Sequence, residues 1–327
     1  MSNLTTLLRA SYRPTAFDEF SAAGKFNLGT ARALAWMSQL AYETADRDKV
    51  SDILGSWQMQ LPVDGIIFGD AHSVLPIAST HAVAAFGRGT TILSFAGTDP
   101  VSLANWVSNF NFRTEPGSTA DGFRQAFEAV EKQVLAIARA RPVDQPLFVT
   151  GHSLGGAVAA IAAQVLQTNR IDVAGVYTFG MPRPGSVAFA RDVYNPALGG
   201  RTYRLVHGKD IVPTVAPSTL GLRHVGCLLR CDRGGRFDPQ TLSADPGLDD
   251  PLFSAASAAQ LRALINDPGS ELIDFGRRLA LVGDIALGRR IMHGRPPSVA
   301  VIVESLPPPI RDHLPDCYIN ALDADAL

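Results

Sequence analysis

The centre of the chain reads Phe148-Val-Thr-Gly-His-Ser-Leu-Gly-Gly-Ala157. An apolar run precedes Ser153 and an alanine-rich run follows it, which is typical of a buried strand that turns into a helix. Gly151 and Gly155 stand two positions before and after the serine, where a larger residue would block so tight a turn. The pattern predicts a nucleophile elbow, with Ser153 at a helix N-terminus whose backbone N–H groups favour developing negative charge.

The segments around this turn alternate between strand-like and helix-like patterns. Apolar runs typical of strands cover residues 63–68, 81–86, 90–95, 173–179 and 202–206. Apolar residues at helical spacing predict helices over residues 29–43 and 122–141, and residues 188–194 fit a crossover helix. The turn signal at residues 87–89 predicts a hairpin. Strands that alternate with helices predict an α/β fold with a mostly parallel central sheet flanked by helices.

The composition fits one large α/β domain over residues 1–327. Of the 327 residues 46% are hydrophobic, which is enough for a sizeable core. The net charge is −2 and no basic block is present, so we expect neither nucleic acid nor an anionic membrane surface as a partner. Three cysteines, Cys227, Cys231 and Cys317, fit a reducing compartment better than a disulfide framework, and they lack the second pair typical of a zinc site.

The first ten residues contain too short an apolar stretch for a signal peptide. We therefore expect a cytoplasmic protein, with secretion by another route left open. Residues 146–169 carry no formal charge, yet they contain the turn around Ser153, which a spanning helix would not need. We expect no transmembrane segment.

The texture of the chain changes over residues 226–297. Arg, Asp, Gly and Pro dominate up to Leu252, and helical patterns follow over residues 253–265 and 270–292. Because further candidate functional residues lie beyond this stretch, we expect a helical insertion within the same domain, able to serve as a cap, before the C-terminal histidine.

A serine at such a turn needs a histidine to take its proton, and the histidine needs a carboxylate partner. In α/β-hydrolase folds these residues follow the order serine, acid, histidine. Asp210 comes after the predicted strand at 202–206 and before Pro213, as the acid should. The competing carboxylates read more simply as a cap, a helix-surface charge and a loop residue: Asp172, Asp192 and Asp238.

His313 is our candidate for the base. It follows a proline-rich approach near the C-terminus, where a loop can carry the ring back over the elbow. His224 also fits a satisfied core histidine, and His293 fits the surface. His152 precedes the serine directly, so its ring points elsewhere, and we expect it to pack beside the pocket.

The oxyanion of an acyl-transfer intermediate needs at least two preset N–H donors. Leu154, the residue after the nucleophile, should supply one, and Thr98 in the loop at residues 95–100 should supply another. The next apolar residues have the spacing of an amphipathic helix: Val101, Leu103, Trp106, Val107 and Phe110. A core helix is the simplest explanation, but its position after the oxyanion loop favours a lid that covers the acyl site and opens at a lipid surface.

Together these motifs resemble the class 3 (fungal-type) lipases of the α/β-hydrolase superfamily. Besides the elbow, the resemblance is carried by Ser94-Phe-Ala-Gly-Thr-Asp99, Asn105-Trp106, Thr178-Phe-Gly-Met-Pro-Arg183, Leu205-Val-His-Gly-Lys-Asp-Ile-Val-Pro213, and Asp312-His313 with Tyr318. The resemblance implies a triad of Ser153, Asp210 and His313. It also implies that Thr98 and Leu154 are the oxyanion donors and that the segment with Trp106 is the lid.

Three features depart from the family pattern. Ala96 stands where these lipases usually have an arginine, and Ala120 stands where they usually have a histidine. The separation of Asp210 from His313 is long, which agrees with an insertion between them. We expect the first two changes to alter lid anchoring rather than chemistry.

We expect hydrolysis of lipid esters of the triacylglycerol lipase type, by acyl transfer to Ser153 and then to water. A phospholipase A and a short-chain esterase remain alternatives, as does a non-catalytic relative that binds lipid or protein. The expected partners are a lipid or small-molecule ester and, transiently, a lipid interface. No cofactor is implied.

Overall fold

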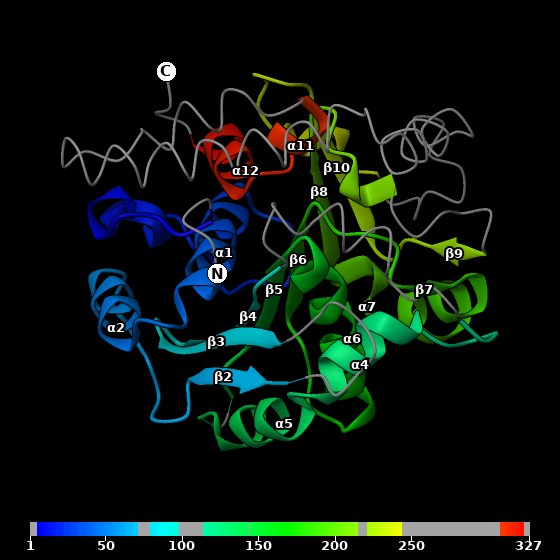
Figure 1. Ribbon diagram of the computed structural model, residues 1–327, viewed down its shortest axis with the longest axis horizontal. Coiled ribbons are helices and arrows are strands. Elements are labelled where there is room, and N and C mark those ends of the chain that lie inside the picture. Colours follow the sequence, from blue (N-terminus) through cyan, green and yellow to red (C-terminus); the bar gives the residue numbers. More distant parts are fainter. Residues whose placement is uncertain are drawn as a thin grey trace, which may run out of the picture.

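The computed structural model describes residues 5–70, 79–97, 114–142, 144–214, 221–243 and 308–323. The described chain forms a sheet with helices on both faces (Figure 1). No helix within these ranges is both long enough and apolar enough to cross a bilayer.

The described strands form one eight-stranded sheet and a small two-stranded one. The main sheet has the order β1-β3-β4-β5-β6-β8-β10, and β2 also pairs with β3. Its strands are β1 (Met59–Gln60), β2 (Ile66–Gly69), β3 (Thr80–Gly87), β4 (Thr90–Phe95), β5 (Leu147–His152), β6 (Gly175–Phe179), β8 (Thr202–His207) and β10 (Cys227–Cys231). From β4 to β10 all neighbours are parallel, whereas the pairs of β3 are antiparallel. The predicted mostly parallel sheet is confirmed.

The hairpin between β3 and β4 also forms as predicted, with Gly87 opposite Thr90. Its two central residues, Arg88 and Gly89, have φ of 48° and 69°. Positive φ at both positions is the requirement of a type I′ turn, which matches the twist of the paired strands. The Arg88 guanidinium donates hydrogen bonds to backbone carbonyls, including that of Phe17 at 2.7 Å, so this turn is tied to the N-terminal segment.

Helices cover the two faces of the sheet and build two cores (Figure 1). One face carries α1 (Leu28–Leu40), α2 (Arg47–Ser56) and α12 (Pro315–Leu322); the other carries α4 (Asp121–Glu128), α5 (Glu131–Ala140), α6 (Leu154–Thr168) and α7 (Asn195–Leu198). Side chains alternate across β5, where Phe148 packs in the core with α1 and Val149 in the core with α6. Every residue of β4 and β5 is buried, as expected of central parallel strands that helices cover on both faces.

Short elements complete the described chain. The second sheet pairs β7 (Gly185–Ser186) with β9 (Leu222–Arg223). Single turns are η1 (Arg9–Ser11), η2 (Pro14–Phe17), η3 (Ala41–Glu43), η6 (Gly199–Arg201), η7 (Val212–Thr214), η9 (Pro239–Thr241) and α11 (Pro308–Arg311). The crossover expected at residues 188–194 is the π-helical η5 (Phe189–Tyr194), followed by α7.

Two sequence-based boundaries need correction. The helix expected over residues 122–141 is divided into α4 and α5, because Val130 leaves helical geometry with φ −121° and ψ −1°. The start expected for the helical insertion, residue 226, is too early, because the residues directly after it form β10, which pairs with β8 inside the main sheet. The predicted helices at 253–265 and 270–292 lie outside the described residues, so the rest of the insertion stays a prediction.

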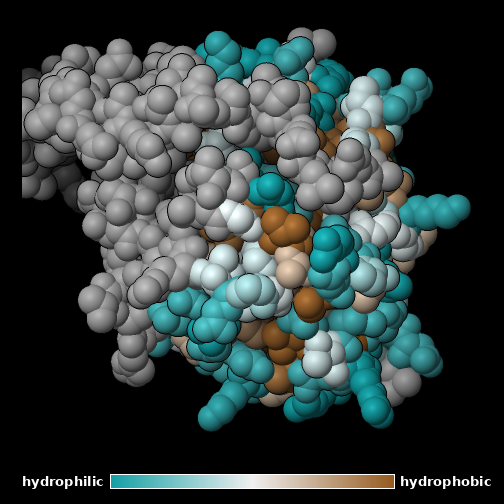
Figure 2. Space-filling model, turned by 90° about the vertical axis from the view of Figure 1, so that its right-hand side faces the viewer, coloured by the Kyte–Doolittle hydropathy of each residue, from teal (hydrophilic) through white to brown (hydrophobic). Residues whose placement is uncertain are grey.

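The described surface has few large exposed apolar side chains, namely Leu8, Val63, Phe68 and Val193. Figure 2 shows one face of the molecule, on which apolar residues are interrupted by hydrophilic ones. Scattered apolar residues of this kind are normal for a protein surface.

Candidate active site

The turn between β5 and α6 has the geometry expected of a nucleophile elbow. Ser153 stands between the last residue of the strand and the first of the helix, with φ 60° and ψ −132°. Residues other than glycine rarely adopt this conformation, which costs on the order of 1–3 kcal/mol. The Ser153 N–H donates a hydrogen bond to the carbonyl of Phe179 at 2.9 Å, so the turn is held against β6.

The glycines around the serine are required by close backbone contacts. A Cβ on Gly151 would lie 2.2 Å from the carbonyl oxygen of Gly155, and a Cβ on Gly155 would lie 2.2 Å from that of Phe95. A Cβ on Gly97 would lie 2.6 Å from Cβ of Ser153. The start of the predicted oxyanion loop therefore approaches the serine more closely than a side chain would allow.

Asp210 and His313 form a buried pair although they lie far apart in the sequence. His313 Nδ1 and Asp210 Oδ2 are 2.8 Å apart, and neither side chain is more than 2% exposed. The other carboxylate oxygen, Oδ1, accepts a hydrogen bond from the Val212 N–H at 2.8 Å. Tyr318 donates its hydroxyl to Asp210 Oδ2 at 2.5 Å. Three donors thus converge on one carboxyl group and fix its orientation.

Gly180 brings this pair next to the elbow. It follows Phe179, whose carbonyl accepts from the Ser153 N–H, and it has φ +62°. A Cβ there would lie 2.6 Å from Asp210 Oδ2 and 2.8 Å from His313 Nδ1. Only the backbone of a glycine therefore fits between the serine turn and the pair of Asp210 and His313.

Two buried polar atoms at this place remain without a hydrogen-bond partner among the described residues. They are Ser153 Oγ and His313 Nε2. Buried polar atoms are usually hydrogen-bonded, so an exception at a strained turn indicates a functional site. A proton transfer from a serine hydroxyl to a histidine uses these two atoms.

The buried ring of His152 contacts the candidate base. Its Nδ1 is 2.7 Å from the hydroxyl of Tyr42, and its Nε2 is 2.6 Å from the carbonyl oxygen of His313. Because a carbonyl only accepts, Nε2 carries the proton and Nδ1 accepts from Tyr42. Burial, and next the nearby His313, hold the pKa of His152 well below its ordinary value, so this ring is neutral.

The competing residues are occupied elsewhere. His224 is buried and its Nε2 lies 2.9 Å from the Pro213 carbonyl, as a core histidine would. Asp172 pairs with Arg201, Asp192 pairs with Arg191, and Asp238 caps η9. His293 lies outside the described residues.

The three cysteines are free thiols. Burial raises the pKa of Cys231 and that of Cys317 to about 12. Since the thiolate is the reactive form, these two side chains are poor nucleophiles at neutral pH.

The predicted oxyanion donor Thr98 and the predicted lid residues Leu103, Trp106, Val107 and Phe110 lie outside the described residues. Leu154 is described and is the first residue of α6, where a helix leaves its N–H groups without an intrahelical partner. Ala96, the first departure from the family pattern, is buried against Ala41 and Tyr42.

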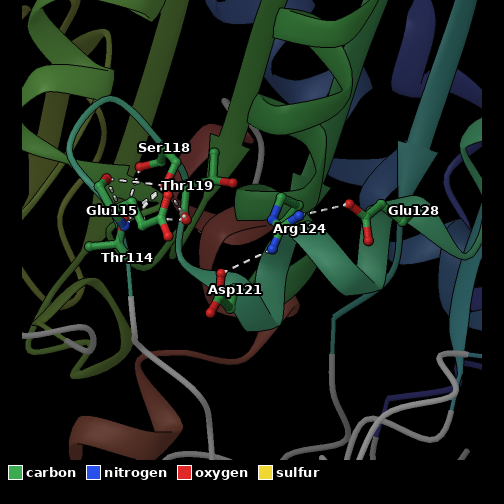
Figure 3. A network of polar contacts seen from close by, with 7 residues as sticks. All are labelled: Thr114, Glu115, Ser118, Thr119, Asp121, Arg124 and Glu128. Carbon is green, nitrogen blue, oxygen red and sulfur yellow. Dashed lines mark hydrogen bonds and ion pairs between the residues drawn. The ribbon is translucent and has the colours of Figure 1, made fainter.

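Beyond the predicted lid, the described chain resumes in a firmly bonded turn before α4 (Figure 3). Thr114 Oγ1 donates to the Ser118 carbonyl at 2.9 Å, and Arg124 lies between Asp121 and Glu128 at 3.1 and 3.2 Å. Ala120, the second departure, is buried, and its N–H donates to the Pro184 carbonyl at 2.9 Å. Backbone contacts therefore anchor this end of the segment.

Comparisons with known proteins relate the chain to lipases. The class 3 lipase family model matches residues 92–220. The chain is 37% identical over 149 residues to a secreted mono- and diacylglycerol lipase of Fusarium solani, covering 42% of each chain. It is 46% identical over 84 residues to another of Malassezia restricta, covering 25% of this chain and 27% of the relative. The chain thus spans less than half the length of these curated relatives.

Among solved structures, the fold is similar to that of the Rhizomucor miehei lipase propeptide complex. The TM-score is 0.52 at 22% identity, over 70% of this chain and 77% of the other. The expectation of a cytoplasmic protein is wrong, because both curated relatives are named as secreted, which points outside the cell. The resemblance predicted from the motifs is confirmed over residues 92–220, which match the class 3 lipase family model, and the fold of the chain is that of the solved lipase.

Proposed function

We propose that this protein hydrolyses carboxylic esters of lipids, with Ser153 as nucleophile, His313 as general base and Asp210 as the carboxylate partner. One observation carries the proposal. The buried hydrogen bond between Asp210 and His313 lies beside a strained serine, and Ser153 Oγ and His313 Nε2 both lack a partner among the described residues.

The first half of the reaction forms an acyl-enzyme. His313 Nε2 takes the proton of Ser153 while Oγ attacks the ester carbonyl carbon. Asp210 accepts the Nδ1–H hydrogen bond, which fixes the tautomer of the neutral ring and stabilises the imidazolium. The imidazolium then gives its proton to the departing alkoxide, and the ester C–O bond breaks.

The second half releases the fatty acid. A water molecule gives a proton to His313 Nε2 and attacks the acyl carbon, and the proton then returns to Ser153 Oγ as the C–O bond to the enzyme breaks. Throughout, the negative charge of each tetrahedral intermediate faces the Leu154 N–H at the start of α6. Thr98 is the second donor in this proposal, supported by the close approach of its neighbour Gly97 to Ser153.

We assign acylglycerols as the substrates. Support comes from the names of the relatives from Fusarium solani and Malassezia restricta, both mono- and diacylglycerol lipases, which favour partial glycerides over the triacylglycerol expected from the sequence. Their description as secreted supports action outside the cell. The segment with Trp106 serves as the lid that contacts a lipid interface.

The test compares Ser153→Ala with wild type on p-nitrophenyl butyrate and on mono-, di- and triolein. We expect wild type to cleave the esters and Ser153→Ala to lose activity by about a thousandfold or more. Ser51→Ala is the matched control, because Ser51 is exposed on α2, and it should keep full activity. Undiminished turnover by folded Ser153→Ala would refute the proposal.

A further inference from the structure

Asp312, the residue before the candidate base, is a buried carboxylate with partners on two other segments. Its side chain is 1% exposed. Oδ1 accepts a hydrogen bond from Nε of Arg233 at 2.7 Å, and Nη2 of Arg233 forms an ion pair with the same oxygen at 2.7 Å. Oδ2 accepts from the backbone N–H of Lys209 at 2.8 Å. Each oxygen therefore ties the loop of His313 to a different part of the fold.

The Lys209 contact is made to the residue directly before the candidate acid. Lys209 lies in the turn between β8 and Asp210, where Gly208 has φ +53°. A Cβ on Gly208 would lie 2.5 Å from Asp312 Oδ2, so the carboxylate rests against the backbone of this turn. The turn is itself tied to the end of β10, because the Gly208 N–H donates to the Cys231 carbonyl at 2.9 Å.

These contacts close a ring around the pair of Asp210 and His313. Asp312 is bonded to His313 through the chain, and Lys209 is bonded to Asp210 in the same way. The hydrogen bond from the Lys209 N–H to Asp312 therefore joins the same two segments as the one between His313 Nδ1 and Asp210 Oδ2, one residue earlier in each. The first bond limits how far the acid and the base can separate.

Arg233 compensates the charge of the buried Asp312 carboxylate. A buried carboxylate is unfavourable unless it is paired and hydrogen-bonded. Arg233 approaches Oδ1 of Asp312 with two nitrogen atoms, so the guanidinium holds this oxygen in place and compensates the buried negative charge. The Arg233 side chain is 38% exposed, so it can be replaced without opening a cavity in the core.

We propose that Asp312 and Arg233 are positioning residues that hold the His313 loop on the Asp210 turn and thereby preform the acid–base pair. The inference rests on the proposed function, because it assigns a role in the reaction of Ser153. Neither residue exchanges a proton with the substrate. Both act through the orientation of His313, which must stay aligned with Ser153 Oγ as the proton moves.

The experiment measures kcat and KM with p-nitrophenyl butyrate and the rate constant of labelling by a fluorophosphonate. The variants are Asp312→Asn, Arg233→Ala, Arg233→Lys and the double variant of the first two. Arg236→Ala is the matched control, an exposed arginine three residues further along the same loop. Active-site titration gives the concentration of folded, reactive enzyme, and every rate is divided by that concentration.

We expect Asp312→Asn and Arg233→Ala to lower kcat and the labelling rate about tenfold while KM changes less than about twofold. Arg233→Lys should recover part of the loss, because an ammonium keeps the charge but not the paired nitrogens. The double variant should be no slower than the worse single variant, since the two residues act through one contact. Arg236→Ala should match wild type.

Three outcomes would overturn the inference. One is a kcat per titrated site within about twofold of wild type in both single variants. Another is an additive double variant, and the third is an equal loss in Arg236→Ala. If Arg233→Ala does not fold, Arg233→Lys and Asp312→Asn decide by the same criteria. Wild type that neither turns over nor reacts with the fluorophosphonate would instead contradict the proposed function itself.

Discussion

The hydroxyl of Tyr42 donates a hydrogen bond to Nδ1 of His152 across 2.7 Å. Tyr42 follows α1 and His152 ends β5, and the other nitrogen of His152 donates to the carbonyl of His313. A Cβ on Gly97 would lie 2.6 Å from the same tyrosine hydroxyl. One chain of contacts therefore joins the start of the predicted oxyanion loop, the strand before the serine and the loop of the candidate base.

Tyr42→Phe tests this chain with the loss of a single oxygen atom. Without the hydroxyl, Nδ1 of His152 becomes a buried acceptor that has lost its donor, at a cost of about 1–3 kcal/mol. We expect the free energy of unfolding to fall by about that amount. Because His313 is then held less firmly, we also expect kcat to fall by a factor of about 3 to 10. Urea unfolding and steady-state kinetics measure the two effects. Unchanged stability together with unchanged kcat would show that the contact is dispensable.

Gly180→Ala should damage the site through backbone geometry alone. A Cβ there would press on Asp210 Oδ2 and His313 Nδ1, and alanine disfavours φ +62°. We expect kcat/KM to fall at least about a hundredfold and stability to fall by about 1–3 kcal/mol.

The control for that substitution is Gly55→Ala. Gly55 lies in α2 and has open space where its Cβ would be, so alanine there should leave activity unchanged and raise stability by about 0.5–1 kcal/mol. Equal kinetics of the two alanine variants would contradict the close approach described at Gly180.

Stability should decline below pH 6.5 because of buried neutral histidines. Burial holds the pKa of His224 well below its ordinary value of 6.5, and the nearby Arg204 and Arg183 lower it further. Below pH 6.5 the unfolded chain binds a proton that the folded His224 does not, so unfolding becomes easier as pH falls. Each such group contributes about 1.4 kcal/mol per pH unit until the lowered pKa of the folded state is reached.

His224→Gln isolates this effect, since the Gln amide can still donate toward the Pro213 carbonyl but does not titrate. Urea unfolding at pH 7.5, 6.5 and 5.5 should show a shallower loss of stability in this variant, by about 1.4 kcal/mol per unit below pH 6.5. Identical pH dependence in both proteins would mean that His224 does not contribute.

Much of the fold was predictable because its signals are local. The glycines around Ser153, the apolar runs of β4 and β5 and the turn at Arg88 each act within a few residues, and the structure bears them out. The edge strand β10 was missed since only alternate residues of Cys227–Cys231 are buried and charged residues surround it. The break between α4 and α5 was missed because apolar spacing continues across Val130.

The contacts that organise the candidate site could not be predicted from local sequence patterns, because they join residues far apart in the chain. The bond from Tyr42 to His152 joins positions 110 residues apart, and that from Lys209 to Asp312 joins positions 103 residues apart. The pairing of Asp210 with His313 was predicted from chain order, whereas the role of Arg233 had no signal in the sequence. The wrong prediction of a cytoplasmic protein came from the short apolar stretch at the N-terminus. That stretch carries no information on the relatives, which are named as secreted.

The most direct measurement of the central claim is to find the atom that a fluorophosphonate modifies. The protein is treated with the reagent, digested and examined by tandem mass spectrometry, with Ser153→Ala in parallel. The account predicts one stoichiometric adduct, on Ser153, that is absent from the variant. An adduct on another residue that persists in Ser153→Ala, or no adduct on active wild type, would contradict the assignment of Ser153 as the nucleophile.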